Sequence, residues 1–329
     1  MAVEWNEIQQ NGTARTGSLE QGACVCRAAD GAGELLMTSY EVFPGIVVIY
    51  KDARLKRYCM PRLEGSRVFE INHCLEGRME CDSGEEFFYL TPGDFSISRQ
   101  SDGNQETCFP LGRYYGITIL VDADRTPCCL SCVLEDVDVR PAELLEQRIG
   151  ESGRLILRDD PRLAHIFSEL YSAPEAVKKG YLKIKVLELF LFLAGTEPGR
   201  AEPCCTGGQV SLARRAGAFI TAHMDQKVTI GQLAGVFHVS ATQLKNSFKE
   251  VYGISVYAYI RAQKMHAAAL MLKQTDHTVL DVAGRFGYDN GSKFAKAFRD
   301  VMGMSPKEYR QKEQQKSRRK LAEQQKKAD

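Results

Sequence analysis

The last hundred residues of this 329-residue chain contain one helix-turn-helix pattern twice. Near the start of the two copies, matched residues are 49 positions apart: Thr229 and Thr278, Ala234 and Ala283, Phe237 and Phe286. Beyond the turn the offset is 50, because the second copy has one extra residue there: Leu244 and Phe294, Phe248 and Phe298, Lys249 and Arg299, Gly253 and Gly303, Ser255 and Ser305, Tyr259 and Tyr309. A repeat restricts the fold strongly, because each copy must form the same supersecondary unit.

Each copy predicts two helices that pack closely across a short turn. The small side chain of Ala234 or Ala283 lets the first helix approach the second. The second helix opens on Ser240 or Asn290, and both residue types favour a helix N-cap. A unit of this kind places its second helix in the major groove of DNA. Two units in one chain therefore predict a protein that reads two successive grooves of double-stranded DNA.

Apolar residues at helical spacing form the expected core of each unit. In the first unit they are Ile230, Leu233, Ala234, Phe237, Leu244 and Phe248. In the second they are Leu280, Val282, Ala283, Phe286, Phe294 and Phe298. Residues 256–273 are expected to form one connecting helix, about 27 Å long at 1.5 Å per residue. That length is commensurate with two recognition helices one turn of DNA apart, about 34 Å.

The outward positions of the two recognition helices carry side chains that suit DNA. Gln and Asn can bond adenine bidentately, Thr can donate or offer its methyl group, and Lys serves guanine or phosphate. The first helix exposes Ala241, Thr242, Gln243, Lys245, Asn246 and Lys249, and the second exposes Gly291, Ser292, Lys293, Lys296 and Arg299. The basic residues of the connecting helix that could add backbone contacts are Arg261, Lys264 and Lys273. Any single lysine could simply be part of the solvated surface. The whole set of polar and basic residues on two capped helices favours binding to DNA.

Charge divides the chain into two halves. Residues 209–329 contain 21 Lys and Arg against 10 Asp and Glu, a net charge of +11. The remaining residues contain 22 against 32 (43 − 21 and 42 − 10), a net charge of −10. An acidic module joined to a basic one suits a regulatory domain attached to a module that binds a polyanion.

Several features favour a cytoplasmic chain with reduced thiols. No stretch approaches the roughly 18–20 apolar residues of a membrane span, and residues 1–10 lack the apolar segment of a signal peptide. All eleven cysteines lie between Cys24 and Cys205, and an odd number without an export signal indicates free thiols. A metal or redox sensor built from Cys24-Val25-Cys26 and the C-x-x-C of Cys129 and Cys132 is the alternative. The usual second ligand pair at zinc spacing is missing.

The N-terminal two thirds predict an α+β arrangement. Residues 1–35 are expected to be an arm or mixed loop, and short β-rich runs between turn signals fill 40–134, typical of a sandwich or barrel. The domain boundaries follow as 1–140 for the β domain, 141–195 for a helical segment, 196–208 for a linker, 209–310 for the helix-turn-helix domain and 311–329 for a charged tail, frayed or disordered. Lys183 to Ala194 is apolar on more than one face, so this helix is expected to be buried against its own β domain, a neighbouring helix or a second subunit.

The motifs of the C-terminal half resemble those of the AraC/XylS family of bacterial transcription regulators. They are Leu233-Ala234, Val239-Ser240, Leu244, Phe248-Lys249, Gly253-Ile254-Ser255 and the closing phrase Gly303-Met304-Ser305-Pro306-Lys307-Glu308-Tyr309-Arg310. The resemblance implies base contacts from Thr242, Gln243, Asn246, Ser292, Lys293 and Lys296. Contacts to the DNA backbone are expected from Ser240, Lys245, Lys249, Arg261, Lys264 and Arg299. The resemblance further implies a cupin-like β-barrel before these units. A homodimer, formed through the apolar helical segment, and contact with RNA polymerase are also expected.

Phe69 to Gly77 and Pro92-Gly93-Asp94 resemble the two halves of a cupin hairpin. Alternation then places an effector pocket inside the barrel, lined by Phe69, Ile71, His73 and Leu75. For His73, a satisfied interior histidine is the alternative to an effector contact. A cupin metalloenzyme needs two or three histidines and a carboxylate around the ion, yet His73 is the only histidine before His165. We therefore expect no metal, no cofactor and no catalytic residues.

These observations predict a DNA-binding transcription regulator, an activator, whose N-terminal barrel senses a small molecule or controls dimerisation. A constitutive DNA binder with a barrel that only dimerises is the alternative. The cupin metalloenzyme is a remote third class.

Overall fold

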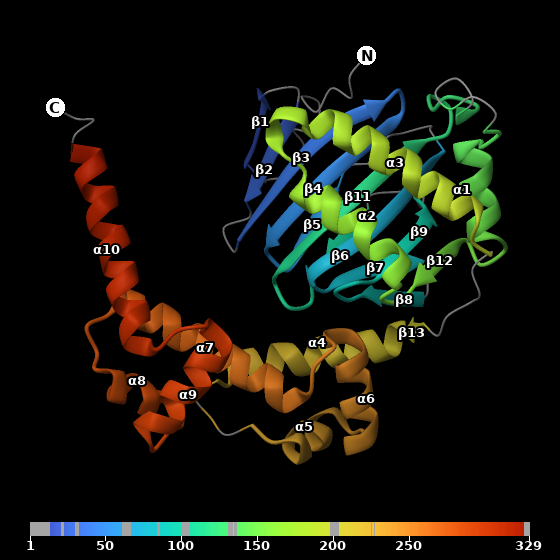
Figure 1. Cartoon of the computed structure of the whole chain (residues 1–329). Coiled ribbons are helices and arrows are strands. Elements are labelled where there is room, and N and C mark those ends of the chain that lie inside the picture. Colours follow the sequence, from blue (N-terminus) through green and yellow to red (C-terminus); the bar gives the residue numbers. More distant parts are fainter. Residues whose placement is uncertain are drawn as a thin grey trace. The chain divides into compact units, whose positions relative to one another are not determined.

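The computed structural model describes residues 14–20, 23–29, 33–60, 67–83, 86–100, 105–130, 134, 137–197, 204–224, 226 and 228–325. The chain divides into two compact units, Met1–Thr206 and Gly207–Asp329 (Figure 1). No helix within the described ranges is both long and apolar enough to cross a membrane. The start of the predicted arm and Cys132 of the C-x-x-C lie outside the described residues.

The first unit contains two antiparallel sheets. The larger, in the order β1-β2-β3-β4-β11-β6-β9-β12, consists of Ala14–Glu20, Ala23–Ala29, Glu34–Phe43, Ile46–Arg54, Tyr114–Asp122, Val68–Gly77, Phe95–Arg99 and Arg154–Leu157. The smaller, in the order β13-β8-β7-β10-β5, consists of Cys205–Thr206, Glu86–Leu90, Met79–Ser83, Gln105–Cys108 and Arg57–Met60. Two sheets stacked face to face bury one face of each strand between them.

Both faces of the larger sheet are buried. One face packs on the smaller sheet, through a core that includes Met37, Ile49 and Phe88. The other face is covered by helices α1 (Pro141–Ile149), α2 (Pro161–Ser172) and α3 (Lys178–Ala194), as Figure 1 shows. A short helix, η3 (Glu175–Val177), precedes α3. The larger sheet is therefore the middle of three layers, with the helices on one side and the smaller sheet on the other.

The β-rich unit followed by helices agrees with the predicted α+β class, but the closed cupin barrel is not confirmed. The described strands belong to two separate ladders, and no pairing between the ladders occurs within the described part of the chain. The predicted hairpin halves do meet, since the Gly93 amide donates to the Cys74 carbonyl at 2.9 Å. Gly93 has φ +89°, a conformation that favours glycine.

Helix α3, which contains Lys183 to Ala194, is buried by its own unit on one side. Leu182, Val186 and Leu189 pack on the sheet, together with Phe190 and Leu193. On the opposite face, Ile184 is 62% exposed and Leu191 is 43% exposed. The apolar character of this helix thus exceeds what its own unit covers.

The second unit is all helical. Its helices are α4 (Gly207–Ala222), α5 (Ile230–Phe237), α6 (Ala241–Tyr252), α7 (Val256–Gln274), α8 (Val279–Arg285), α9 (Gly291–Met302) and α10 (Pro306–Gln325). The pairs α5–α6 and α8–α9 are the two predicted helix-turn-helix units, and α7 is the predicted connecting helix. Helix α4 packs along α6 and completes the first unit, which the sequence reasoning did not foresee.

Two predicted segments differ from the structure. In the predicted linker 196–208, Cys205–Thr206 pairs with β8 as strand β13, and the helix α4 already begins at Gly207. Residues 198–203 of that linker lie outside the described residues. Of the two alternatives for the tail, the helix is found as far as Gln325, because α10 continues through a run of good helix formers.

The contact between α4 and α6 provides a test of the fold. A Cβ atom at Gly217 would lie 2.3 Å from the hydroxyl oxygen of Tyr252, whose ring stacks on Phe248 with centroids 4.4 Å apart. We predict that Gly217→Ala lowers the free energy of unfolding by about 1–3 kcal/mol through overpacking, measured by urea denaturation followed by circular dichroism. Gly231→Ala is the control, because a Cβ there meets no atom within 4 Å, and it should stabilise by up to about 1 kcal/mol. Equal effects of both variants would contradict the packing described.

Candidate nucleic-acid interface

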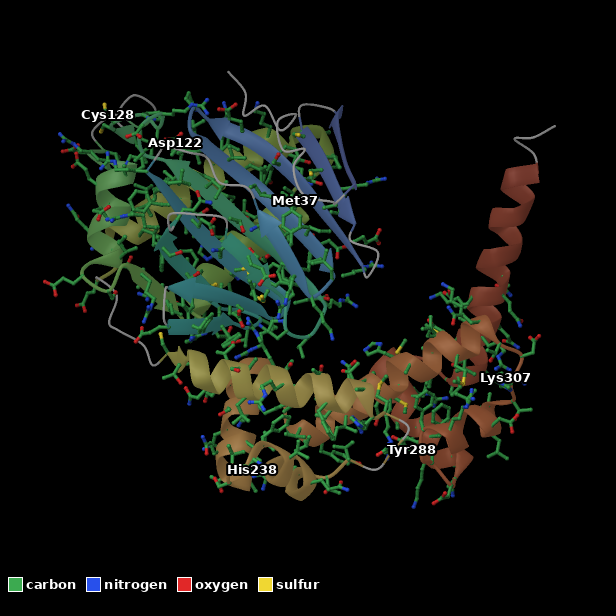
Figure 2. All side chains as sticks on the ribbon, turned by 180° about the vertical axis from the view of Figure 1, so that it is seen from behind. Met37, Asp122, Cys128, His238, Tyr288 and Lys307 are labelled. Atoms are coloured by element: carbon green, nitrogen blue, oxygen red, sulfur yellow. The ribbon has the colours of Figure 1, made fainter. Side chains whose placement is uncertain are left out.

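The first helix-turn-helix unit is held by caps at both helix starts. The Thr229 hydroxyl accepts from the Gln232 amide at 3.3 Å, while the Thr229 amide donates to Gln232 Oε1 at 2.9 Å. Ser240 starts α6 by accepting from the Gln243 amide at 3.1 Å. In the turn, His238 (Figure 2) has a left-handed φ of 53°. The next residue returns an amide hydrogen bond of 3.0 Å to the carbonyl of the buried Ala234.

The second unit repeats these contacts with one insertion. Thr278 forms a capping box with Asp281. Asn290 Oδ1 accepts hydrogen bonds from the backbone amides of Ser292 and Lys293. Gly287, with φ +79°, occupies the left-handed position of His238. The Tyr288 amide donates to the Ala283 carbonyl at 3.0 Å, as in the first unit. The extra residue of the repeat therefore falls between Tyr288 and Asn290, after the turn has closed.

The other repeated residues have the same roles in both copies. Gly253 and Gly303 end α6 and α9 in left-handed conformations, with φ of 71° and 74°. Ser255 caps α7 and Ser305 caps α10, each through its hydroxyl. The sequence repeat is thus a repeat of backbone requirements: three helix caps, one close helix approach and two left-handed residues in each copy.

All six side chains predicted to read bases are exposed on the recognition helices. They are Thr242, Gln243 and Asn246 on α6, and Ser292, Lys293 and Lys296 on α9. Within the described residues, no intramolecular hydrogen bond or ion pair of their side chains is present. Buried Leu244 and Phe248, and likewise Phe294 and Phe298, hold the opposite helix faces. Both helices therefore present polar or cationic edges that an outside partner can bind.

The residues predicted to contact the DNA backbone divide into two groups. Lys245, Lys249 and Arg299 are exposed, as is the capping residue Ser240. Lys264, however, donates to the carbonyls of Phe286 at 3.0 Å and Gln226 at 3.3 Å. Arg261 is half-buried and pairs with Asp300 at 3.5 Å. On the connecting helix both cations bind groups of their own domain, and the Lys264 ammonium caps the end of α8. A contact of Lys264 or Arg261 to the DNA backbone stays a prediction.

One predicted core residue of the second unit is also misplaced. Leu280 is 64% exposed, whereas Val282 and Ala283 are buried as expected. Helix α8 has only seven residues, about two turns, and buries only Val282 and Ala283. Leu280, its second residue, therefore points outward. In the first unit Leu233 and Ala234 are buried, while Ile230 and Phe237 are half-buried.

Comparisons with known proteins bear mainly on this unit, although one match, over 157 residues, is longer than the unit itself. Residues 233–312 match the family model of a helix-turn-helix domain. The right origin-binding protein of Escherichia coli is 29% identical over 102 residues, covering 31% of this chain and 35% of that protein. The melibiose operon regulatory protein of Escherichia coli is 29% identical over 157 residues, covering 45% and 51%. A Chromobacterium violaceum regulator with an AraC-type DNA-binding domain is 21% identical, with a TM-score of 0.32, over 33% of this chain and 96% of that one.

The C-terminal unit is an AraC-type helix-turn-helix domain. The chain spans about a third to a half of the length of these two curated relatives. The matched residues include both recognition helices and the closing phrase.

The closing phrase holds the AraC-type domain together. Tyr309 packs its ring edge on Phe298, with centroids 5.7 Å apart. Arg310 donates to the carbonyls of Leu272 and His277, and so binds α10 to the C-terminal end of α7. A cation at a helix C-terminus also interacts favourably with the helix dipole. This part of the motif therefore serves packing, and the base-reading residues lie elsewhere.

The residues predicted to line an effector pocket do not converge inside the sandwich. Phe69 and Ile71 face the helices and belong to that core. His73 stacks on Phe167 with centroids 4.0 Å apart, and Leu75 is 39% exposed. The predicted position of these residues inside the barrel is wrong. Both faces of β6 are buried, so the alternation of its residues could not show which face turns toward the smaller sheet and which toward the helices. Burial lowers the pKa of His73 to about 4 against a smaller opposing effect of Asp94, as suits an interior histidine.

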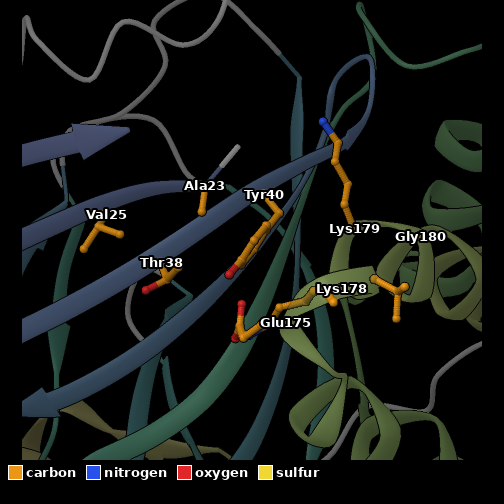
Figure 3. A pocket seen from close by; sticks show the side chains of 10 residues that line it. Ala23, Val25, Thr38, Tyr40, Glu175, Lys178, Lys179 and Gly180 are labelled. Carbon is orange, nitrogen blue, oxygen red and sulfur yellow. The ribbon is translucent and has the colours of Figure 1, made fainter. Parts of the chain in front are cut away.

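An open pocket of about 830 Å³ lies elsewhere in the first unit, between strands β2 and β3 and the start of α3 (Figure 3). Its wall includes Tyr40, Glu175 and Lys178. The Lys178 ammonium pairs with Glu175 and lies 5.4 Å from the ring centre of Tyr40. Of the two lysines that line this pocket, Lys178 is thus already bound within the chain. No cluster of metal-ligating side chains occurs in the described ranges.

The geometry of α6 separates two roles in binding. We predict that Asn246→Ala relaxes base preference at one position of the DNA site, costing about 1–3 kcal/mol against the preferred base, with an unchanged salt slope. Lys249→Ala should weaken all sequences alike and reduce the salt slope by about 1. Fluorescence anisotropy on matched DNA duplexes at several salt concentrations measures both. The same loss on every sequence for the two variants would refute the roles assigned.

Proposed function

We propose that this chain is a sequence-specific, DNA-binding transcription regulator that acts as an activator in the cytoplasm. Its N-terminal unit would bind a small molecule or control dimerisation, and RNA polymerase would be a further partner of the DNA-bound protein. A small molecule would act by binding one conformation of the regulator better than another, which shifts the equilibrium by that difference in affinity.

The observation that carries the proposal is the pair of capped recognition helices with unoccupied polar edges. The α6 edge offers Thr242, Gln243 and Asn246, which suit hydrogen bonds to base edges. The α9 edge offers two lysines at Lys293 and Lys296, which suit guanine or phosphate. The names of the relatives support the proposal, since one is named an origin-binding protein and the other an operon regulatory protein.

Selection of bound sequences from random DNA by the full chain tests this function. The expected result is a two-part motif whose halves are about ten base pairs apart, because adjacent major grooves are one helical turn apart. A motif one groove wide would mean that α9 contributes contacts to the DNA backbone and reads no bases. Gly291 lowers the helix propensity at the start of that helix. Failure of the folded protein to enrich any sequence would refute DNA-reading itself.

The uncovered face of α3 supports self-association. Val177, Tyr181, Ile184 and Leu191 are exposed at intervals of four, three and seven residues, the spacing of a coiled-coil seam. Glu188 completes the seam and is bound within its own chain by Lys185 at 2.7 Å and His165 at 2.8 Å. A second copy of the chain would bring an identical helix with the same period.

We predict that Ile184→Glu shifts the protein toward monomers, because it places a charge in the centre of an apolar seam. Sedimentation velocity of the full chain measures the shift. Leu36→Glu, at another exposed apolar position in the same unit, is the matched control and should leave the association unchanged. A wild-type monomer, or an Ile184→Glu variant that associates as strongly as wild type, would exclude α3 as the dimer surface. The alternative, a constitutive dimeric DNA binder, is tested by thermal unfolding with candidate small molecules. A regulator that senses a small molecule would be stabilised by it, whereas a constitutive binder would be stabilised by none.

A further inference from the structure

A buried arginine of the first unit lies between a carboxylate and a thiol. Arg154 begins strand β12 of the larger sheet and is only 8% exposed. Its Nη2 atom donates to Oε2 of Glu86, the first residue of β8 in the smaller sheet, at 3.0 Å. The same nitrogen donates to Sγ of Cys204 at 2.7 Å. The guanidinium, which also lies 5.6 Å from the ring centre of Phe88, therefore connects the two sheets through this thiol and this carboxylate.

Cys204 differs from three other thiols in the direction of its hydrogen bond. The thiols of Cys74, Cys108 and Cys129 donate to carbonyl or carboxylate oxygens. An arginine has no acceptor, so the sulfur of Cys204 must accept the hydrogen bond from Arg154. A neutral thiol accepts weakly, whereas an adjacent arginine favours the thiolate, which is the nucleophilic form of cysteine.

Burial has the opposite effect on thiols in the core of the same unit. Burial raises the pKa of Cys74 to about 12, and it also raises the pKa of Cys81. These two thiols therefore stay protonated and unreactive at neutral pH. Cys204 is only partly buried, where it packs against the margin of the core between the sheets. A small reagent can reach its sulfur.

The guanidinium beside Cys204 has a donor without an acceptor. Arg154 Nε is fully buried and has no hydrogen-bond partner among the described residues. Buried polar groups are nearly always hydrogen-bonded, so such an exception needs an explanation. An oxygen atom bonded to Cys204 Sγ would bring an acceptor next to this guanidinium. The missing partner therefore favours oxidation, which adds one oxygen, over the attachment of a bulky group to a half-buried thiol.

We propose that hydrogen peroxide oxidises Cys204 to a sulfenic acid, whose oxygen binds to the Arg154 guanidinium. Hydrogen bonds from Arg154 and Cys204 lower the pKa of Glu86, so this carboxylate is ionised and takes the proton of the thiol. The thiolate sulfur then attacks one oxygen of the peroxide, and the O–O bond breaks. The leaving hydroxide takes the proton from Glu86 and departs as water. The sulfur is thereby oxidised by two electrons, and the peroxide is reduced to water.

The proposed modification lies at the end of the first unit. Cys204 directly precedes strand β13, in which Cys205 pairs with Phe87 of β8, and the helix-turn-helix unit begins at Gly207. The sulfenic acid would therefore form in the segment that leads into that unit. Its formation needs neither DNA nor a second copy of the chain, so it stands apart from the proposed function.

The test treats the reduced full chain with hydrogen peroxide and dimedone, which traps sulfenic acids, and follows each cysteine by peptide mass spectrometry. Cys128 (Figure 2) is the internal control, because it is exposed on the same chain. Cys204 should be labelled at least about tenfold faster than Cys128, because the arginine favours its thiolate. Fragment spectra separate Cys204 from its neighbour Cys205, which is buried.

Variants of the arginine test its role. Arg154→Met should slow the labelling of Cys204 about tenfold or more, whereas Arg154→Lys, which keeps a cation, should retain part of the rate. Arg162→Met, which removes an exposed arginine of the same unit, is the matched control and should label like wild type. Labelling of Cys128 should be the same in all variants, and thermal unfolding shows whether each is folded.

Equal labelling of Cys204 and Cys128 in the wild-type chain would overturn the site, and this comparison needs no variant to fold. An unchanged rate at Cys204 in a folded Arg154→Met variant would overturn the role of the arginine. A disulfide between Cys204 and Cys205 in place of the dimedone adduct would overturn the assigned product.

Discussion

The close approach of the two helices at Ala234 and at Ala283 is the constraint on which the DNA-binding half depends. In both units, the amide five residues after the alanine returns to the alanine carbonyl at 3.0 Å. That bond closes the turn before the recognition helix begins, so the helix direction is fixed before any base-reading side chain appears. A larger side chain at the alanine would separate the helices and rotate every exposed position of α6 or α9. The insertion after Tyr288 is tolerated because it follows the closed turn.

The first unit depends on a sheet that is buried on both faces. Its helix side is almost wholly apolar, with Phe95, Ile97 and Phe167 among the largest side chains. Its other side combines Ile49 and Met37 with Lys51 and Asn72. An apolar core on the helix side supplies much of the stability of such a unit, which leaves the inner side free to carry polar groups that a purely structural sandwich would exclude.

The sequence predicted the second unit well and the first only in outline. Caps, glycines and small residues have local causes, so Ser240, Asn290 and Gly303 could be assigned from their neighbours alone. Leu280 proved exposed because its burial depends on how α8 packs on other helices, which its own neighbours in the sequence do not show. The partners of Lys264 could not be foreseen, because the carbonyls of Gln226 and Phe286 lie far along the chain from it. In β6, both alternating sets of residues are buried, so no periodicity distinguished the helix side from the sandwich interior. The apolar excess of α3 was visible, but which of its faces its own sheet covers was not.

The buried polar side chains between the two sheets lower the stability of the first unit. Marginal stability means that a protein keeps an uncompensated buried charge only where the rest of its fold is secure. Here the helix-covered core gives that security, while Lys51 on β4 and Ser96 on β9 are buried on the opposite side of the larger sheet.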